Sequence, residues 1–320
     1  MNILLTGASG VIGSALEPFL ANQSHRVIEL VRISGEGKPA PAQAWWNPNA
    51  GQIGLENAPR LDAVIHLAGE NIAQRWTPAA KVRIYKSRVE GTKLLTKALA
   101  SLPRPPEVFL SASAIGYYGD RGDELLDERS AAGTGFLADL CRDWEAATGA
   151  VVEHAIRVVN LRIGIVLATQ GALGKMLPAF RFGLGGKLGN GRQFWSWIEL
   201  DDLLGAINLL LSDQTLKGPI NLVSPHPVTN AEFTQTLGSV LRRPTIFSMP
   251  ALAVKLAFGE MADAALLASA RVRPARLEER GFVFRYPELQ GALRHVVGSS
   301  SPGLSCRTGC NRSDDRFNGH

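Results

Sequence analysis

The chain has 320 residues, of which 45% are hydrophobic and 20% charged, the balance of an ordinary globular protein of one large or two modest domains. Its formal net charge of +5 favours anionic small ligands, but no dense Lys/Arg block with interleaved aromatic residues is present, so we expect no nucleic-acid partner. No apolar run approaches the roughly 18 residues that a membrane span needs, so we expect no membrane partner. The N-terminus has the pattern of a core strand instead of a cleavable leader, which predicts a cytoplasmic protein.

The strongest motif joins the first expected strand to the first expected helix. A short apolar strand at residues 2–5 leads through Gly7, Gly10 and Gly13 into a helix with an apolar side. Gly7 permits a tight turn, Gly10 lets the backbone approach a pyrophosphate, and Gly13 lets the helix lie against the strand. The free N–H groups of the first helical turn then face the phosphates, and the helix dipole adds to the attraction. The motif therefore predicts dinucleotide binding.

A second strand is expected over residues 26–32, and it ends at Val31 and Arg32. In a dinucleotide-binding fold this strand end meets the adenosine ribose, where a carboxylate would select NAD. We find no carboxylate at these last positions, and the Arg32 guanidinium is available to a 2′-phosphate. This favours NADP over NAD, and the alternative is a surface arginine at a strand end.

Strands and helices alternate through the first half of the chain. Further buried strands are expected at 61–69, 107–113 and 154–167, and helices at 77–100 and 135–148. The alternation predicts an α/β class, doubly wound parallel-sheet Rossmann fold over residues 1–168, to which residues 198–224 return.

The rest of the chain has a more mixed pattern. We expect residues 169–197 and 225–297 to form a smaller, mostly helical lobe on the substrate side, with helices at 230–241, 251–267 and 289–297. In the returning segment, Asp201 and Asp202 are expected to cap a helix over 203–211. Residues 298–320 are polar, and we expect a disordered tail.

Small and basic residues near the expected strand ends are further cofactor candidates. Ala68 and Gly69 end the strand expected at 61–69 and would let a cofactor pass close to the backbone. His66, in that strand, fits a hydrogen-bonded core histidine better than a base. Arg88 belongs to a polar insertion in an otherwise apolar helix, and it is either a solvated charge or a phosphate or ribose contact.

Hydroxyl groups gather at the end of the strand at 107–113. Ser111 and Ser113 lie on one face of that strand, and Tyr117 and Tyr118 follow directly. A carbonyl oxygen could be held and protonated by such groups. The alternative is turn chemistry, which Ser, Gly and Tyr also suit.

The cysteines do not indicate a metal site or a disulfide framework. Cys141 lies on the apolar stripe of an expected helix, whereas Cys306 and Cys310 lie in the tail with His320 nearby. A zinc site needs four ligands at defined spacing, which this sparse set lacks. We therefore expect no metal.

Five segments of the chain resemble the extended short-chain dehydrogenase/reductase superfamily, namely residues 6–13, 66–69, 89–95, 111–119 and 197–203. Further segments look like its epimerase-like subfamily with a short C-terminal domain of its own, namely 69–72, 75–76, 87–88, 116–120, 136–138, 144–145, 273–277 and 281–288. The resemblance implies that NADP(H) is bound by Gly7, Ser9, Gly10, Val11, Ile12, Arg32, Leu67, Ala68 and Arg88. To these we add the neighbouring candidates Gly13, Val31, Gly69 and Ser111.

The chain departs from the superfamily in its catalytic pair. Active members use a Ser or Thr with a Tyr-x-x-x-Lys helix, in which the lysine lowers the pKa of the tyrosine. None of the four tyrosines here has a lysine four residues later, and no lysine occurs from residue 98 to residue 174. The matching helix offers Phe136 with Leu140, or Leu137 with Cys141. Only Ser113 keeps the superfamily position.

Two functions remain open at this stage. The first is an NADP(H)-dependent oxidoreductase or epimerase that acts on a small carbonyl or hydroxyl compound such as a nucleotide sugar. Tyr117 or Tyr118 would then supply the acid beside Ser113. The second is a non-catalytic NADP(H)-binding regulator or redox sensor, which the missing Tyr and Lys favour. Superfamily members often form homodimers through helices that here correspond to 78–100 and 135–148.

Overall fold

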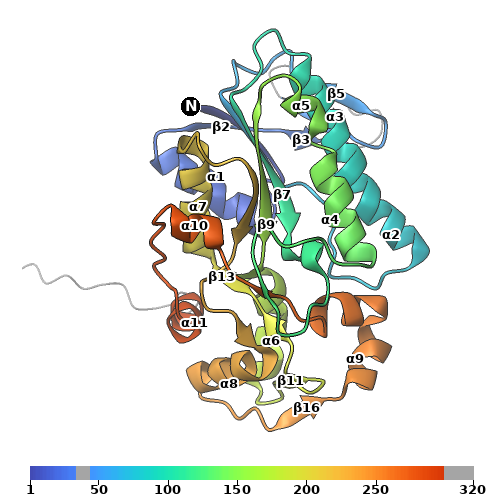
Figure 1. The fold of residues 1–320 in the computed structure, drawn as a ribbon, viewed down its shortest axis with the longest axis vertical. Coiled ribbons are helices and arrows are strands. Elements are labelled where there is room, and N and C mark those ends of the chain that lie inside the picture. The colour runs from blue at the N-terminus through green and yellow to red at the C-terminus, as the bar shows by residue number, and fades with distance from the viewer. Residues whose placement is uncertain (34–43, 299–320) are drawn as a thin grey trace, which may run out of the picture.

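The computed structural model describes residues 1–33 and 44–298. A six-stranded parallel sheet lies at the centre of the N-terminal part (Figure 1), in the order β14-β9-β7-β6-β1-β2. Its strands are β1 (Asn2–Thr6), β2 (Arg26–Glu29), β6 (Ala63–His66), β7 (Val108–Ala114), β9 (Arg157–Ile163) and β14 (Gly218–Leu222). The predicted α/β fold with a doubly wound parallel sheet is confirmed.

Helices cover both faces of the sheet because its strands are apolar on both sides. Ile3 and Leu5 face one core with Leu16 of α1, whereas Leu4 faces the opposite core with Leu95 of α3. The first face carries α1 (Val11–Asn22), α7 (Leu200–Ser212) and α10 (Ala275–Glu279). The second face carries α2 (Pro78–Tyr85), the π-helical turn η1 (Lys86–Glu90), α3 (Gly91–Ala100), α4 (Phe136–Ala146) and α5 (Gly149–Val152).

The switch point of the sheet lies between β1 and β6. Strand β1 pairs with β2 on one side and with β6 on the other, so that Leu5 is opposite both Glu29 and Ile65. The chain leaves the ends of β1 and β6 toward opposite faces, which opens a crevice at their carboxyl ends.

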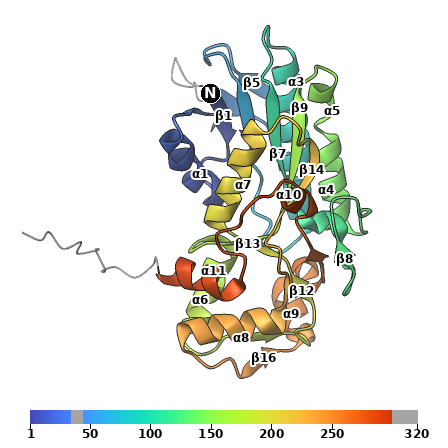
Figure 2. The same cartoon turned by 60° about the vertical axis from the view of Figure 1, so that its left-hand side comes forward.

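A smaller lobe lies beyond the carboxyl ends of the strands (Figures 1 and 2). Its helices are α6 (Gly171–Arg181), α8 (Asn230–Leu241), α9 (Ala251–Phe258), the π-helical turn η3 (Ala262–Leu266) and α11 (Leu289–Gly298). Three two-stranded sheets join segments of this part of the chain. They pair β10 (Ile165–Leu167) with β13 (Trp197–Glu199), β11 (Gly186–Leu188) with β16 (Phe247–Met249), and β12 (Phe194–Trp195) with β15 (Val228–Thr229).

Two further small sheets complete the described chain. One contains β3 (Val31–Arg32), β4 (Trp45–Asn47) and β5 (Gln52–Gly54), and the other contains β8 (Leu125–Leu126) and β17 (Arg271–Val272). A short 3-10 turn, η2 (Ile115–Tyr118), follows β7. Within the described ranges, no helix has both the length and the apolar character to cross a membrane.

Several expected elements are divided in the structure. The strand expected at 26–32 leaves the main sheet after Glu29, and the helix expected at 77–100 is interrupted by η1. The helix expected at 251–267 ends as α9 at Phe258, because Gly259 has a φ of 63°. The strand expected at 154–167 divides at Gly164, where a Cβ atom would lie 2.7 Å from the Ser196 carbonyl oxygen.

The expected cap of α7 is wrong. The side chain of Glu199, not Asp201 or Asp202, accepts hydrogen bonds from the first-turn backbone. The Asp202 carboxylate instead accepts from the backbone N–H groups of Arg285 and Tyr286, at 2.7 and 2.9 Å. It thereby fixes the segment that leads into α11.

The division of the chain into a Rossmann part and a lobe stays a prediction. Leu277, Phe282 and Phe284, which we expected in the lobe, pack with the core under α1 and α7. The disordered tail was expected from residue 298, but Gly298 is the last residue of α11, and residues 299–320 lie outside the described residues.

Candidate cofactor and substrate site

The glycine turn after β1 leaves no room for a side chain at Gly7 or Gly13. Gly7 has a φ of 74°, and a Cβ atom on it would lie 2.9 Å from the Ala68 backbone nitrogen. A Cβ atom on Gly13 would lie 2.2 Å from the Gly7 carbonyl oxygen. Helix α1 begins after Gly10 with no side-chain cap and no acidic residue in its first turn. The N–H groups of that turn are therefore suited to bind an anion.

A cleft of about 1140 Å³ opens beside this turn. It is bounded by the glycine turn, the end of β2, the turn after β4 and the residues that follow β6. Of the expected cofactor residues, Gly7, Ser9, Val31, Arg32, Ala68 and Gly69 line it. Gly10, Val11, Ile12 and Gly13 lie at the start of α1, and Leu67 directly follows β6.

Charges of both signs lie at the end of the cleft where the adenosine ribose of the cofactor is expected. Arg32 is exposed and lines the cleft, as the sequence predicts for a 2′-phosphate ligand. The expectation that no carboxylate lies near the end of the second strand is wrong, because β2 ends at Glu29, which also lines the cleft. Partial burial and then the neighbouring Glu17 of α1 raise the pKa of Glu29.

His66 is a hydrogen-bonded core residue, as expected. The Thr6 hydroxyl accepts from the Leu67 and Ala68 N–H groups, both at 3.1 Å, so its proton is directed to His66 Nδ1 at 2.7 Å. His66 Nε2 then donates to Thr92 Oγ1 at 3.0 Å. Burial lowers the pKa of His66 to about 4, and the imidazole stays neutral. This network fixes the backbone of the crevice between β1 and β6.

Arg88 is directed against the backbone that follows β6. Its Nη1 atom donates to the Glu70 carbonyl oxygen at 2.9 Å, and its guanidinium lies 5.1 Å from the centre of the Trp144 ring. A Cβ atom on Gly69 would lie 3.0 Å from Arg88 Cζ. The π-helical turn shifts the helix register here, a feature that recurs at functional sites. The solvated-charge alternative does not fit this placement.

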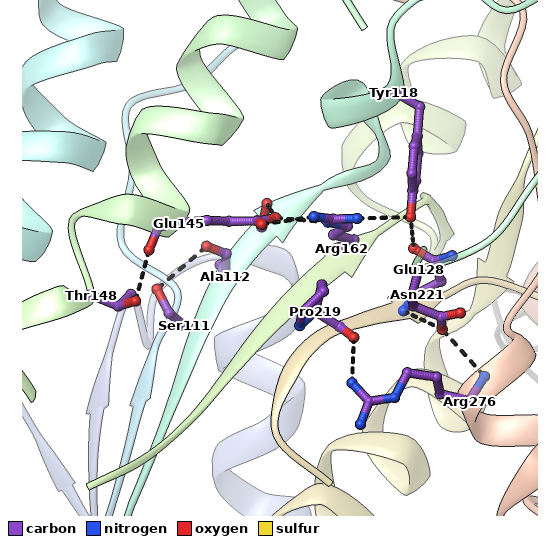
Figure 3. Close-up of polar contacts among 11 residues, drawn as sticks. Ser111, Ala112, Tyr118, Glu128, Glu145, Thr148, Arg162, Pro219, Asn221 and Arg276 are labelled. Atoms are coloured by element: carbon purple, nitrogen blue, oxygen red, sulfur yellow. Dashed lines mark hydrogen bonds and ion pairs between the residues drawn. The ribbon is translucent and has the colours of Figure 1, made fainter. Parts of the chain in front are cut away.

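A buried polar network joins the ends of β7, β9 and β14 (Figure 3). Arg162 of β9 donates to both carboxylate oxygens of Glu145 of α4, each at 2.8 Å. Arg162 Nη1 also donates to the Tyr118 hydroxyl at 3.0 Å, which donates in turn to Asn221 Oδ1 at 2.7 Å. The Ser113 hydroxyl donates to Glu145 Oε1 at 2.7 Å.

The structure separates the hydroxyl candidates. Tyr118 is 0% exposed and burial raises its pKa to about 12, so its expected role as an acid does not fit this geometry. Ser111 is also fully buried within the sheet, which does not fit the expected cofactor contact of its side chain. Tyr117 is partly exposed, with Arg162 Cζ 3.5 Å from its ring centre. Tyr117 is therefore the phenol that this strand end presents.

The residues that this chain offers in place of the superfamily's Tyr and Lys also lie in apolar surroundings in the structure. Leu137 and Cys141 of α4 lie against Gly116, where a Cβ atom would lie 3.4 Å from Leu137 Cβ and 3.8 Å from Cys141 Sγ. Burial, followed by the Glu145 carboxylate, raises the pKa of Cys141 to about 12, and the Arg88 guanidinium opposes the rise. The charge of Arg88 therefore acts on the Cys141 side of α4.

Our sequence reasoning missed Glu145, Arg162 and Glu128. The signal was present in Arg162, a charged residue in the middle of a mostly apolar strand, because a buried charge needs a buried partner. Glu128 accepts from the Asn221 backbone at 3.0 Å, and burial raises its pKa.

Comparison with known proteins defines the class. The profile of the NAD-dependent epimerase/dehydratase family matches residues 3–222, and a domain of unknown function, DUF1731, matches residues 249–296. The chain belongs to the NAD-dependent epimerase/dehydratase family.

Two curated relatives and two solved structures resemble nearly the whole chain. Epimerase family protein ML0860 of Mycobacterium leprae is 43% identical over 92% of this chain and 95% of its own. Human epimerase family protein SDR39U1 is 36% identical over 93% and 100%. The crystal structure of human SDR39U1 with NADPH has a TM-score of 0.83 at 34% identity, over 93% of this chain and 99% of that one. A Corynebacterium glutamicum structure described as a nucleoside-diphosphate sugar epimerase has a TM-score of 0.76 at 34% identity, over 93% and 58%. The expected resemblance is confirmed.

Proposed function

We propose that the protein binds NADPH in the cleft between β1 and β6 and acts as an oxidoreductase or epimerase on a small carbonyl or hydroxyl compound. The observation that carries the proposal is the turn at Gly7, Gly10 and Gly13, where a Cβ atom would crowd the neighbouring backbone and where helix α1 begins without a side-chain cap, a geometry that fits a pyrophosphate. The structure of human SDR39U1 with NADPH supports the same cofactor.

Each part of the cofactor has a candidate partner in this chain. The backbone of the glycine turn and the start of α1 would hold the pyrophosphate, and Arg32 would hold the 2′-phosphate. Arg88, beside Gly69, adds a second cation at the carboxyl end of β6. NADPH supplies a hydride when bound, and the protein supplies position and electrostatics.

The substrate end requires a different assignment from the superfamily. The Ser113 side chain is 3% exposed and its hydroxyl donates to Glu145, so its oxygen keeps lone pairs that can accept a hydrogen bond. Tyr117, on the turn after β7, is the phenol that we assign to proton transfer.

One observation favours a second function. The matching helix offers Phe136 with Leu140, or Leu137 with Cys141, and none of these side chains can transfer a proton at neutral pH in this site. An NADPH-binding regulator or redox sensor would need only the cofactor cleft.

The test is turnover of bound NADPH. We would follow its near-ultraviolet absorbance with a panel of small aldehydes, ketones and nucleotide sugars, in the wild type and in Tyr117→Phe. Oxidation by one compound that is lost in Tyr117→Phe supports the proposal. Tight NADPH binding without oxidation by any compound would support the regulator instead, and unchanged turnover in Tyr117→Phe would refute the assigned acid.

A further inference from the structure

Three side chains of the kinds that bind metal ions meet at the start of α7. Glu199 ends β13, Asp201 lies in the first turn of α7, and His295 lies in the last turn of α11, which comes close to both (Figure 2). One ligand atom from each residue lies within 4.8 Å of the other two. None of the three residues lines the cofactor cleft, so the cluster is separate from it.

The spacing of the ligand atoms suits a bound ion. His295 Nε2 lies 3.4 Å from Asp201 Oδ2 and 3.9 Å from Glu199 Oε1. Two ligands of a tetrahedral zinc ion, with bonds of about 2.0–2.1 Å, lie about 3.4 Å from each other. The shorter distance matches this geometry, and the wider separations need the side chains to close in on the ion.

Glu199 is the buried ligand of the cluster. Its side chain is 2% exposed, and its Oε2 atom accepts hydrogen bonds from the backbone N–H groups of Asp201 and Asp202, at 2.6 and 3.4 Å. Its Oε1 atom accepts no hydrogen bond within the described part of the chain, and it faces His295 Nε2 from beyond hydrogen-bonding distance. Oε1 is not sealed from solvent, so an ion can reach it. An oxygen of a buried carboxylate is normally paired, so Oε1 points to a missing partner.

The imidazole of His295 is held in place beside the carboxylates. The ring of Tyr286 stacks on it, with the ring centres 4.5 Å apart and the planes at 21°. The Tyr286 backbone N–H donates in turn to Asp202 Oδ2 at 2.9 Å, and Asp202 lies in the first turn of α7 beside Asp201. The same helical turn thus carries one ligand and anchors the ring behind another. A ligand set that is arranged in advance loses little conformational freedom when an ion binds.

The charges of the cluster also favour a cation. Among the residues that the structure describes, the ion pairs of Glu199 and Asp201 are both with His295. Burial, followed by the Asp201 carboxylate, raises the pKa of Glu199 to about 7, so the surroundings compensate its negative charge poorly. A divalent cation between the two carboxylates would supply that compensation.

The donor atoms select among metal ions. One imidazole with two carboxylates suits Zn²⁺ and other divalent transition-metal ions, whereas Ca²⁺ and Mg²⁺ prefer oxygen ligands alone. Three protein ligands leave a fourth position for water. The set contains no cysteine, so the expectation of no metal, which considered the cysteines, did not cover it.

We propose that Glu199, Asp201 and His295 bind a divalent transition-metal ion, with Zn²⁺ as the expected occupant. The ligands are Glu199 Oε1, Asp201 Oδ2 and His295 Nε2, and water completes the coordination. The ion joins α11 to the end of β13 and the start of α7, and it thereby stabilises the position of the last described helix.

The experiment is a calorimetric titration of the full-length protein, freed of metals with a chelator, with zinc chloride in a buffer without phosphate. We expect saturable binding of one zinc ion per chain, and no binding of calcium chloride. His295→Ala should weaken zinc binding more than tenfold. Glu199→Gln, which keeps an oxygen for the N–H groups of α7 but removes the charge, should do the same, so the test does not depend on one variant.

Two controls separate this site from other ligands in the chain. His226 lies 2.8 Å from Glu288, and both side chains are more exposed than those of the cluster. His226→Ala removes this single pair and should leave zinc affinity unchanged. The double variant Cys306→Ser with Cys310→Ser removes two thiols that could bind zinc by themselves, and it should also bind zinc as the wild type does.

Thermal unfolding gives a second measurement. Zinc should raise the Tm of the wild type and of His226→Ala but not that of His295→Ala. A wild-type Tm that zinc leaves unchanged would mean that the three side chains form an ion pair only. No saturable zinc binding, equal effects of the two histidine variants, equal binding of calcium, or a loss confined to the cysteine variant would each overturn the proposal. None of these results depends on NADPH, so the cofactor proposal is judged separately.

Discussion

Replacing Arg162 with leucine removes the cation that holds the buried polar network together. The Arg162 side chain is 4% exposed and that of Glu145 is 12% exposed, and two bonds of 2.8 Å join them. Without Arg162, the Glu145 carboxylate and the Tyr118 hydroxyl each lose a buried partner. Breaking one side of a buried ion pair costs about 3–5 kcal/mol, out of a total stability of about 5–15 kcal/mol for a typical protein.

The chain offers a matched control on α4. Arg142 pairs with Asp139 at 2.8 Å, but the two side chains are 54% and 53% exposed. An exposed pair of this kind contributes about 0–1 kcal/mol, so Arg142→Leu should have little effect. The double variant Arg162→Leu with Glu145→Leu leaves no unpaired charge, and we expect it to be more stable than Arg162→Leu alone.

The assay is urea unfolding at neutral pH, followed by circular dichroism, with the free energy of unfolding compared among the variants. We expect a loss of several kcal/mol for Arg162→Leu and a partial recovery in the double variant. A loss no larger than that of Arg142→Leu would refute the reasoning.

Three further predictions follow from the site. Gly13→Ala should weaken NADPH binding more than tenfold, because the added Cβ atom would lie 2.2 Å from the Gly7 carbonyl oxygen. Calorimetric titration with NADPH checks this prediction. Gly149→Ala is the control, because a Cβ atom there meets nothing within 4 Å. The buried His66, with its pKa lowered from 6.5 to about 4, binds a proton less readily in the folded state than in the unfolded state, so stability falls as pH falls through this window, by about 3 kcal/mol in all. The difference in unfolding free energy between wild type and His66→Gln should therefore shrink as the pH falls, and a constant difference would contradict the burial argument. Tyr118→Phe should lower the free energy of unfolding in urea by about 1–3 kcal/mol, because Arg162 and Asn221 each lose a buried hydrogen bond. Tyr117→Phe should lower it little. Equal losses in the two variants would refute the structural role assigned to Tyr118.

Features set by neighbouring residues could be predicted from the sequence. The glycine turn could be predicted because Gly7, Gly10 and Gly13 follow the first strand at three-residue spacing. The start of α2 was readable because Thr77 accepts from the Ala80 N–H at 3.2 Å and Pro78 follows as the first helical residue. Such signals lie within a few residues of each other, so no tertiary knowledge is needed.

Features set by distant residues could not be predicted. Tyr118 is buried because Arg162 and Asn221 come from two other strands and take both roles of its hydroxyl. The π-helical turn at Lys86–Glu90 has no composition of its own, because the same residues fit an α-helix. The end of β2 at Glu29 depends on where β3 leaves to pair with β4. In each case the deciding partner is remote in the sequence.

The most direct test of the cofactor proposal is calorimetric titration with NADPH and NADH, in the wild type and in Arg32→Ala. We predict that the wild type binds NADPH more tightly than NADH, and that Arg32→Ala loses about 10- to 100-fold in NADPH affinity while its NADH affinity is unchanged. Equal affinities for the two cofactors in the wild type, or an Arg32→Ala variant that binds NADPH as well as the wild type, would contradict the account.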